Sequence, residues 1–321
     1  MVKIRIPPEA ISKYPYLLGY SFFDLYLLKK SCMQFLIFII AYPLLWFISI
    51  LPFRIFYWIS DLMYFVVYYI IGYRKKTVRE NLKITLPHLT AKEHLAIEKK
   101  FYRHFCDMFM EMAKTMTMSA EEMSKRFKIS NIELIKEYEA KGKSIMLLAS
   151  HYASWEWLLS FNIQLSYQGI AVYKKIANPY FDKLTRDIRS KYKTELVSTD
   201  KTIPLMANNN RKGILSVYGL ASDQSPKRVQ IAHWESFMGI ETPVHIGPEL
   251  LSKKYNLNVL FAKVKKVKRG YYEMTLIPIT DDPKSLPNYE IIHRYIKEVE
   301  KQIYEAPEYY FWTHKRWKHH H

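Results

Sequence analysis

The chain has 321 residues, with 48 Lys and Arg against 30 Asp and Glu, which gives a formal net charge of +18. This length fits one large α/β domain or two small ones, and the charge favours an anionic partner such as nucleic acid, anionic lipid or an acidic protein. The 2 cysteines, Cys32 and Cys106, exclude a disulfide framework and a cysteine metal site, and they indicate a reducing compartment.

Residues 1–72 are predicted to form a helical membrane anchor. The run Ser31–Phe53 carries no charge and has the length of about 20 residues that spans a bilayer core. A second apolar stretch, Ile55–Gly72, follows it, and Pro43 and Pro52 are expected to kink or break the helices. Three arrangements remain open: one spanning helix with the second in the interface, a shallow hairpin, or a buried core pair.

Basic residues follow the second apolar stretch, at Arg74, Lys75 and Lys76. Positive charge beside a membrane segment is typical of the cytoplasmic side. We therefore expect residues 73–318 to form a domain on the cytoplasmic side of the membrane. Residues 319–321 are interpreted as the remnant of a purification tag.

The first helices of this domain are predicted from their ends. Arg74–Leu86 is expected to be a short basic helix that stops at Pro87, and Thr90 and Glu93 have the spacing of a capping box for the next helix. That helix has one apolar face, which favours core over the wall of an acyl-chain pocket. The face consists of Ile97, Phe101, Phe105, Met108, Met112 and Met116.

After Asn131 the pattern alternates between strands and helices, which predicts an α/β fold with a mainly parallel sheet flanked by helices. The predicted strands are Ser144–Ala149, Ile170–Tyr173, Glu195–Ser198, Ile214–Gly219, Asn258–Val264 and Tyr272–Ile279. The predicted helices are Trp155–Leu165, Pro179–Tyr192, Ile203–Lys212, Pro248–Tyr255 and Tyr289–Tyr304.

The pair His151 and Glu156 follows the first of these strands and opens the next predicted helix. An imidazole there accepts a proton, and a carboxylate in the next turn fixes its tautomer and stabilises its charged form. The two residues are therefore the candidate catalytic pair, with His151 as general base and Glu156 as the group that orients it. Ser150 and Ser154 are interpreted as turn and capping residues.

Other polar residues suggest contacts to substrate. Arg186, Arg189 and Lys193 form either a solvated surface or a site for phosphate, and Asn178 begins their helix. Asp223 and Gln224 follow a strand, and ligands gather at the carboxyl ends of parallel strands, although Asp223-Gln224-Ser225-Pro226 also suits a turn.

Two more segments allow more than one interpretation. Phe237–Gly247 leads to a helix whose free N–H groups suit an oxyanion or phosphate, although close packing also explains its glycines. The basic run Lys263–Arg269 suits nucleic acid, but no nucleic-acid motif accompanies it, so membrane headgroups or an acidic carrier protein fit better. We expect no nucleic acid partner.

Taken together, these patterns resemble the late acyltransferases of lipid A biosynthesis, the lauroyl/myristoyl transferase type. The resemblance covers most of the chain: the basic segment Arg74–Leu82 with Leu86-Pro87, the His-x-x-x-x-Asp/Glu spacing of His151 and Glu156, Asn178, Asp223-Gln224, Phe237–Gly247 and the C-terminal run Pro307–Trp317. The Trp-Thr-His-Lys-Arg-Trp end of that run is the most specific part.

The resemblance implies an O-acyltransferase that moves a fatty acyl chain from an acyl thioester, on acyl carrier protein or coenzyme A, to a lipid A precursor or related glycolipid in the membrane. It implies a glycerolipid-acyltransferase-like fold, and no cofactor or metal site is expected. A lysophospholipid or aminolipid acyltransferase is the alternative enzyme, and a non-catalytic basic protein that binds membrane surface or nucleic acid is the alternative of another class. The candidate substrate-binding residues are Asn178, Arg186, Arg189, Asp223, Gln224, Gly239, Thr242, Gly247, His314 and Arg316.

Overall fold

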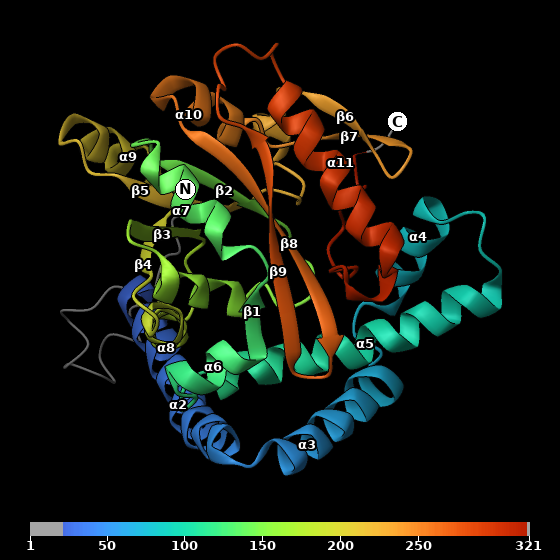
Figure 1. Ribbon diagram of the computed structural model, residues 1–321. Helices are drawn as coiled ribbons and strands as arrows, with labels where there is room; N and C mark the ends of the chain where they lie inside the picture. The colour runs from blue at the N-terminus through green and yellow to red at the C-terminus, as the bar shows by residue number, and fades with distance from the viewer. Residues whose placement is uncertain (1–21, 320–321) are drawn as a thin grey trace.

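The computed structural model describes residues 22–319, and its centre is a 7-stranded sheet in the order β1-β9-β8-β2-β5-β3-β4. The β8–β9 pair is antiparallel, and the other neighbours within this sheet run parallel. Helices lie on both faces of the sheet (Figure 1). The predicted α/β class with a mainly parallel mixed sheet is therefore confirmed.

All the predicted strands are present, with ends that differ by a few residues. The strands of the large sheet are β1 (Phe127–Ile129), β2 (Ile145–Ala149), β3 (Gln168–Tyr173), β4 (Glu195–Ser198), β5 (Ser216–Ala221), β8 (Asn258–Lys268) and β9 (Tyr271–Thr280). A separate antiparallel hairpin consists of β6 (Trp234–Phe237) and β7 (Ile240–Pro243). The sequence did not predict β1, β6 and β7, which are too short to show a clear period.

The helices of the domain confirm most of the predicted segments. They are α4 (Lys75–Thr85), α5 (Ala91–Lys114), α6 (Ala120–Arg126), α7 (Ile132–Ala140), α8 (Pro179–Ser190), α9 (Thr202–Arg211), α10 (Gly247–Tyr255) and α11 (Glu290–Glu305), with short 3₁₀ segments η3 (Trp157–Gln164), η4 (Arg228–Gln230) and η5 (Pro307–Tyr309). The capping box is confirmed, because Thr90 and Glu93 cap α5 reciprocally. The predicted α-helix Trp155–Leu165 is instead the 3₁₀ segment η3.

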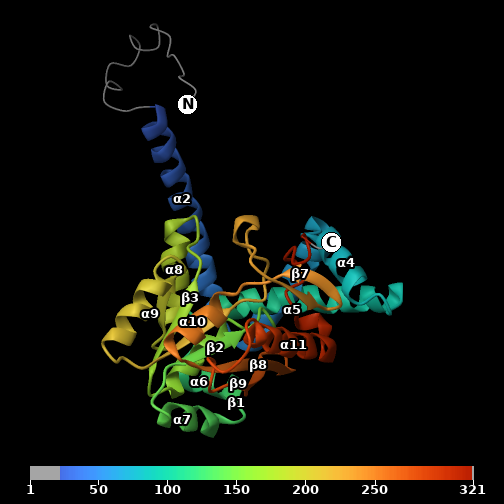
Figure 2. The same ribbon diagram turned by 90° about the horizontal axis from the view of Figure 1, so that it is seen from above.

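The N-terminal helices differ in how they meet the domain. α2 (Phe22–Ile50) projects from the body (Figure 2), whereas α3 (Phe53–Phe65) packs one face on α5 and continues into the π-helical segment η2 (Val66–Ile71). Pro52 separates the two helices, and Pro43 remains within α2. By length and composition, α2 and the combined α3–η2 segment could each cross a membrane, and only 11% and 17% of their apolar windows are buried. That exposure contradicts the arrangement as a buried core pair.

The basic run forms the tip of the β8–β9 hairpin, and part of it is buried. The side chain of Lys266 is 8% exposed and lies 3.5 Å from Asp107 of α5. Arg269 forms ion pairs with Asp61 of α3 and with the same Asp107. Within the run Lys263–Arg269, Lys266 and Arg269 are therefore partnered by carboxylates of α3 and α5, while Lys265 and Lys268 remain exposed. The expected contact of this run with membrane headgroups or an acidic carrier protein stays a prediction.

Candidate active site

The register of two neighbouring strands brings His151 and Asp223 together. β2 is the central strand, with all its residues buried, and it pairs with β5 so that Ala149 lies opposite Ala221. His151 and Asp223 each lie two residues beyond that pair, at the carboxyl ends of the strands. Ligands of parallel sheets bind at the carboxyl ends of the strands, so the sheet itself sets the position of the candidate base.

Asp223 binds His151 through two hydrogen bonds. The backbone N–H of His151 donates to Oδ2 of Asp223 at 3.1 Å, and Nδ1 lies 2.7 Å from Oδ1. An ionised carboxylate only accepts, so Nδ1 carries the proton and Nε2 of a neutral ring is free to accept another. The side chain of His151 is 24% exposed while Asp223 is 1% exposed, so the histidine is the member of the pair that solvent or a substrate reaches.

The electrostatics of the pair favour a protonated His151. Burial lowers the pKa of His151, but the charge and hydrogen bond of Asp223 outweigh it, and the pKa is raised above its ordinary value. Burial likewise raises the pKa of Asp223, but the contacts to His151 outweigh it and lower that pKa below the usual range. Both shifts have the same cause, an ion pair inside the protein, and they suit a base that must hold a proton during a reaction.

Glu156 does not hold the ring of His151, so the predicted orienting partner is wrong. Its carboxylate accepts two hydrogen bonds from Arg189, from Nε at 2.9 Å and from Nη2 at 2.5 Å, and a third from Trp155 Nε1 at 3.2 Å. The chain leaves β2 through a turn rather than a helix, with Ala153 at a φ of 49°. Glu156 and Arg189 still lie near enough to act on the pKa of His151, in opposite directions.

Aromatic rings and the C-terminal segment border His151. The Trp155 ring lies 5.4 Å and the Phe311 ring 6.2 Å from the imidazole, centroid to centroid. The backbone N–H of Phe311 donates to the carbonyl of His151 at 3.1 Å. His314 is near as well: burial, followed by neighbouring positive groups, lowers its pKa to about 4, so this imidazole is neutral at pH 7.

Contacts with α4 explain why the basic helix and the C-terminal run belong together. The side-chain amide of Asn81 donates to the carbonyls of Trp312 at 2.8 Å and His314 at 2.9 Å. Arg74 donates to the carbonyl of Thr313 at 3.0 Å. Two segments from opposite ends of the sequence therefore fix one another beside His151.

Several predicted substrate-binding residues have structural contacts away from the His151–Asp223 pair. Asn178 caps α8 and its amide donates to the carbonyl of Gln34 in α2, so it joins the projecting helix to the domain. Arg186 pairs with Asp182 of its own helix on the surface. Gln224 follows Asp223 and is half-buried. The predicted cluster of Arg186, Arg189 and Lys193 is thus divided, since Arg189 alone turns inward to Glu156.

The β6–β7 hairpin accounts for another group of candidates. Arg316 is fully buried and donates through Nη1 to the hydroxyl of Thr242 at 3.0 Å and to the carbonyl of Pro243 at 2.9 Å. Thr242 is also fully buried, so neither side chain is accessible to a substrate in this structure, which contradicts their predicted role. Gly239 has a φ of 76° in the hairpin turn, and Gly247 begins α10.

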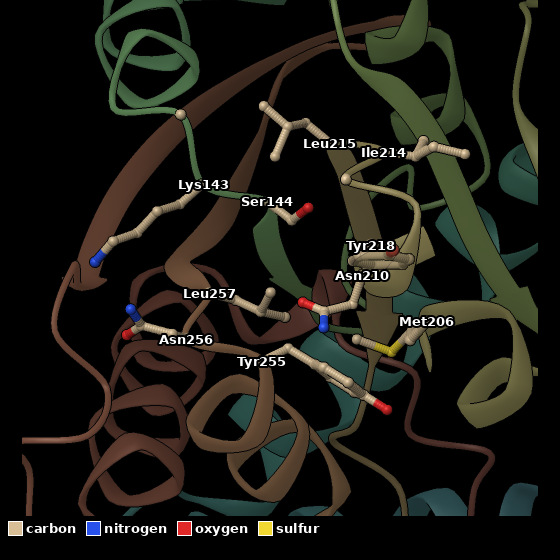
Figure 3. Close-up of a pocket in the computed structure, with 12 residues that line it drawn as sticks. Lys143, Ser144, Met206, Asn210, Ile214, Leu215, Tyr218, Tyr255, Asn256 and Leu257 are labelled. Carbon is tan, nitrogen blue, oxygen red and sulfur yellow. The ribbon is translucent and has the colours of Figure 1, made fainter. Parts of the chain in front are cut away.

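A cavity of about 170 Å³ lies at the amino ends of the strands (Figure 3). It is lined by Lys143 and Ser144 before β2, by Ile214 and Leu215 before β5, and by Leu257 before β8. Those positions are the amino ends of the strands, opposite the end that carries His151. The cavity is therefore separate from the candidate active site.

Comparison with known proteins identifies the family of this chain. A model of the family described as bacterial lipid A biosynthesis acyltransferase matches residues 28–319. This chain belongs to that family. It is 23% identical over 255 residues to a lipid A biosynthesis acyltransferase of Haemophilus influenzae, covering 75% of this chain and 76% of the relative. It is 22% identical over 276 residues to the lipid A biosynthesis lauroyltransferase of Escherichia coli K12, covering 85% of this chain and 89% of the relative.

As a lipid A biosynthesis acyltransferase, the protein is an enzyme, and the alternative of a non-catalytic binding protein is wrong. The sequence indicated His151, Asp223, Glu156, Arg189 and His314 as candidates but favoured Glu156 over Asp223 as the partner of His151. It did not identify His104 of α5, which lies behind the turn that follows His151. A single histidine among the many charged and apolar residues of α5 gives little signal, because such residues are commonly structural.

Proposed function

We propose that this acyltransferase moves a fatty acyl chain from an acyl thioester to a hydroxyl group of a lipid A precursor, with His151 as general base. The observation that carries the proposal is the His151–Asp223 pair at the ends of β2 and β5, with Nδ1 fixed at 2.7 Å from the carboxylate. Asp223 takes the orienting role that the sequence had assigned to Glu156.

In the proposed reaction, Nε2 of His151 accepts the proton of the acceptor hydroxyl while the hydroxyl oxygen attacks the thioester carbonyl. A C–O bond forms, the C–S bond breaks, and the imidazolium returns the proton to the departing thiolate. Asp223 stabilises the imidazolium during this step. The rings of Trp155 and Phe311 provide an apolar border that disfavours attack by water.

Charge and exposed apolar surface support the proposed donor and location. The net charge of +18 suits an acidic acyl carrier protein as donor and an anionic phospholipid surface beneath the enzyme. Large apolar side chains are exposed on α2, α3 and η2, among them Ile40, Trp58 and Ile70 at 75%, 72% and 68%. We propose attachment to the inner membrane with the catalytic domain on the cytoplasmic side.

Purified enzyme in detergent, mixed with an acyl carrier protein thioester and a lipid A precursor, is expected to yield a lipid heavier by one acyl group, detected by mass spectrometry. Acyl coenzyme A in a parallel reaction distinguishes the two donors. A lysophospholipid in place of the precursor tests the other acceptor class. Acylation of the lysophospholipid alone would overturn the proposed acceptor, and no acylation of either lipid would overturn the reaction.

A truncation tests the membrane anchor without removing core residues. Deleting residues 1–44 is expected to weaken binding to vesicles, because it removes most of the exposed surface of α2, while α3 and η2 keep part of the binding. Deleting residues 1–72 is expected to prevent folding, since Phe56, Tyr64 and Tyr68 are 0%, 8% and 3% exposed. Vesicle sedimentation and thermal unfolding measure the two effects. Equal sedimentation of the short truncation and the full chain would contradict the anchor role of α2.

A further inference from the structure

A chain of polar contacts runs from the apolar helix α3 to the interior of the domain. Asp61 of α3 accepts from Arg269 at 2.8 and 3.0 Å, and Arg269 donates through Nη2 to Asp107 of α5 at 2.6 Å. Ser60 of α3 donates to the same carboxylate at 2.8 Å. Asp107 is 2% exposed, so α3 is joined to the domain by a buried charge and not only by apolar packing.

Lys266 extends this chain to His104. Its ammonium lies 3.5 Å from Oδ2 of Asp107 and 3.1 Å from Nδ1 of His104. An ammonium group only donates hydrogen bonds, so Nδ1 of His104 is the acceptor and the proton of the neutral ring is on Nε2. Burial, followed by the charge of Lys266, holds the pKa of His104 well below its ordinary value, which keeps the ring neutral. The contacts therefore define one tautomer.

The protonated Nε2 of His104 meets the turn that follows His151. It lies 3.3 Å from the carbonyl oxygen of Ala153, while the N–H of Ala153 donates to the carbonyl of Tyr309 at 2.9 Å. Ala153 has a φ of 49°, in the left-handed region that residues with a Cβ rarely adopt. Contacts on both sides are the means by which a structure maintains such a conformation.

The conformation of this turn sets the directions of the His151 and Glu156 side chains. Ala153 lies between His151, which pairs with Asp223, and Glu156, which pairs with Arg189. A change at Ala153 would alter the position of His151 relative to a bound thioester. Displacement of a reacting group by about 1 Å lowers the rate by about 10²-fold.

We propose that His104 is a positioning residue for acyl transfer: its Nε2–H holds the carbonyl of Ala153, and Lys266 fixes the tautomer that makes this possible. Through Asp107 and Arg269, the same contacts link the turn to α3, so the helix next to the membrane supports the position of the base. The inference rests on the proposed function, in which His151 is the general base.

Two polar substitutions at His104 test its contact with Ala153 separately from its contact with Lys266. The amide of His104→Gln reaches the position of Nε2 and keeps a donor for Ala153, whereas the side chain of His104→Asn is shorter, keeps an acceptor for Lys266 and loses the donor. With purified full-length enzyme and an acyl carrier protein thioester, the Asn variant is expected to lower kcat by about 10- to 100-fold. The Gln variant is expected to retain most of kcat, and KM for the donor is expected to stay the same in both.

The outcomes distinguish positioning from general support of the fold. Equal kcat in the Asn and Gln variants, whether normal or reduced, overturns the proposal, since rescue by Gln is its specific result. If the Asn variant does not fold, Lys266→Met serves instead, and an unchanged kcat there overturns it. His151→Ala in the same assay tests the proposed function. Full activity in that variant refutes His151 as the general base. If His151→Ala is inactive while the His104→Asn and His104→Gln variants have equal kcat, only the role of His104 is refuted.

Discussion

Replacing His151 with Ala is expected to lower kcat for acyl transfer by roughly 10²–10⁴-fold, the range that a general base contributes. The side chain is 24% exposed and its Nε2 is the free acceptor, so its loss removes the base without opening a large cavity. The fold and membrane binding are expected to persist. Thermal unfolding and vesicle sedimentation, measured on the preparation used for kinetics, test whether the fold and the membrane binding persist.

His88→Ala is the matched control, because His88 is an exposed histidine on the loop between α4 and α5. Its kcat is expected to equal that of the unchanged enzyme. If His151→Ala also turned over at the normal rate, His151 would not be the base, and the attacking hydroxyl would need another proton acceptor.

Replacing Asp223 with Asn is expected to lower kcat/KM by about 10²–10⁴-fold and to move the pH profile to lower pH. Asp223 raises the pKa of His151, whereas burial lowers it. With the carboxylate removed, the effect of burial remains, so the pKa of His151 falls. Because the base acts in its neutral form, the rising limb of kcat/KM against pH then appears at lower pH. Profiles of log kcat/KM measured across that limb test the shift.

Glu156→Gln provides the comparison for Asp223→Asn. Glu156 also raises the pKa of His151, but its oxygens accept from Arg189 and not from the imidazole. The shift of the rising limb is therefore expected in the same direction and to be smaller. A larger shift for Glu156→Gln than for Asp223→Asn would mean that Glu156, as the spacing suggested, is the group that orients His151.

Local sequence patterns determined much of the framework. The apolar run of β2 predicts a buried strand, because only a strand covered on both faces has no polar alternation. Thr90 and Glu93 predict the start of α5, since the two residues satisfy one another's backbone donors without help from the rest of the chain. The position of His151 at a strand end follows from the same local signals.

The partner of His151 was decided by tertiary structure. Asp223 lies 72 positions away in the chain, and only the parallel register of β2 with β5 brings it to 2.7 Å. Sequence spacing favoured Glu156, but the turn at Ala153 directs that carboxylate to Arg189. The burial of Lys266 has the same origin, because its neighbours come from α5. Strand ends and caps depend on adjacent residues, whereas ion pairs and proton acceptors depend on which distant segments the sheet places side by side.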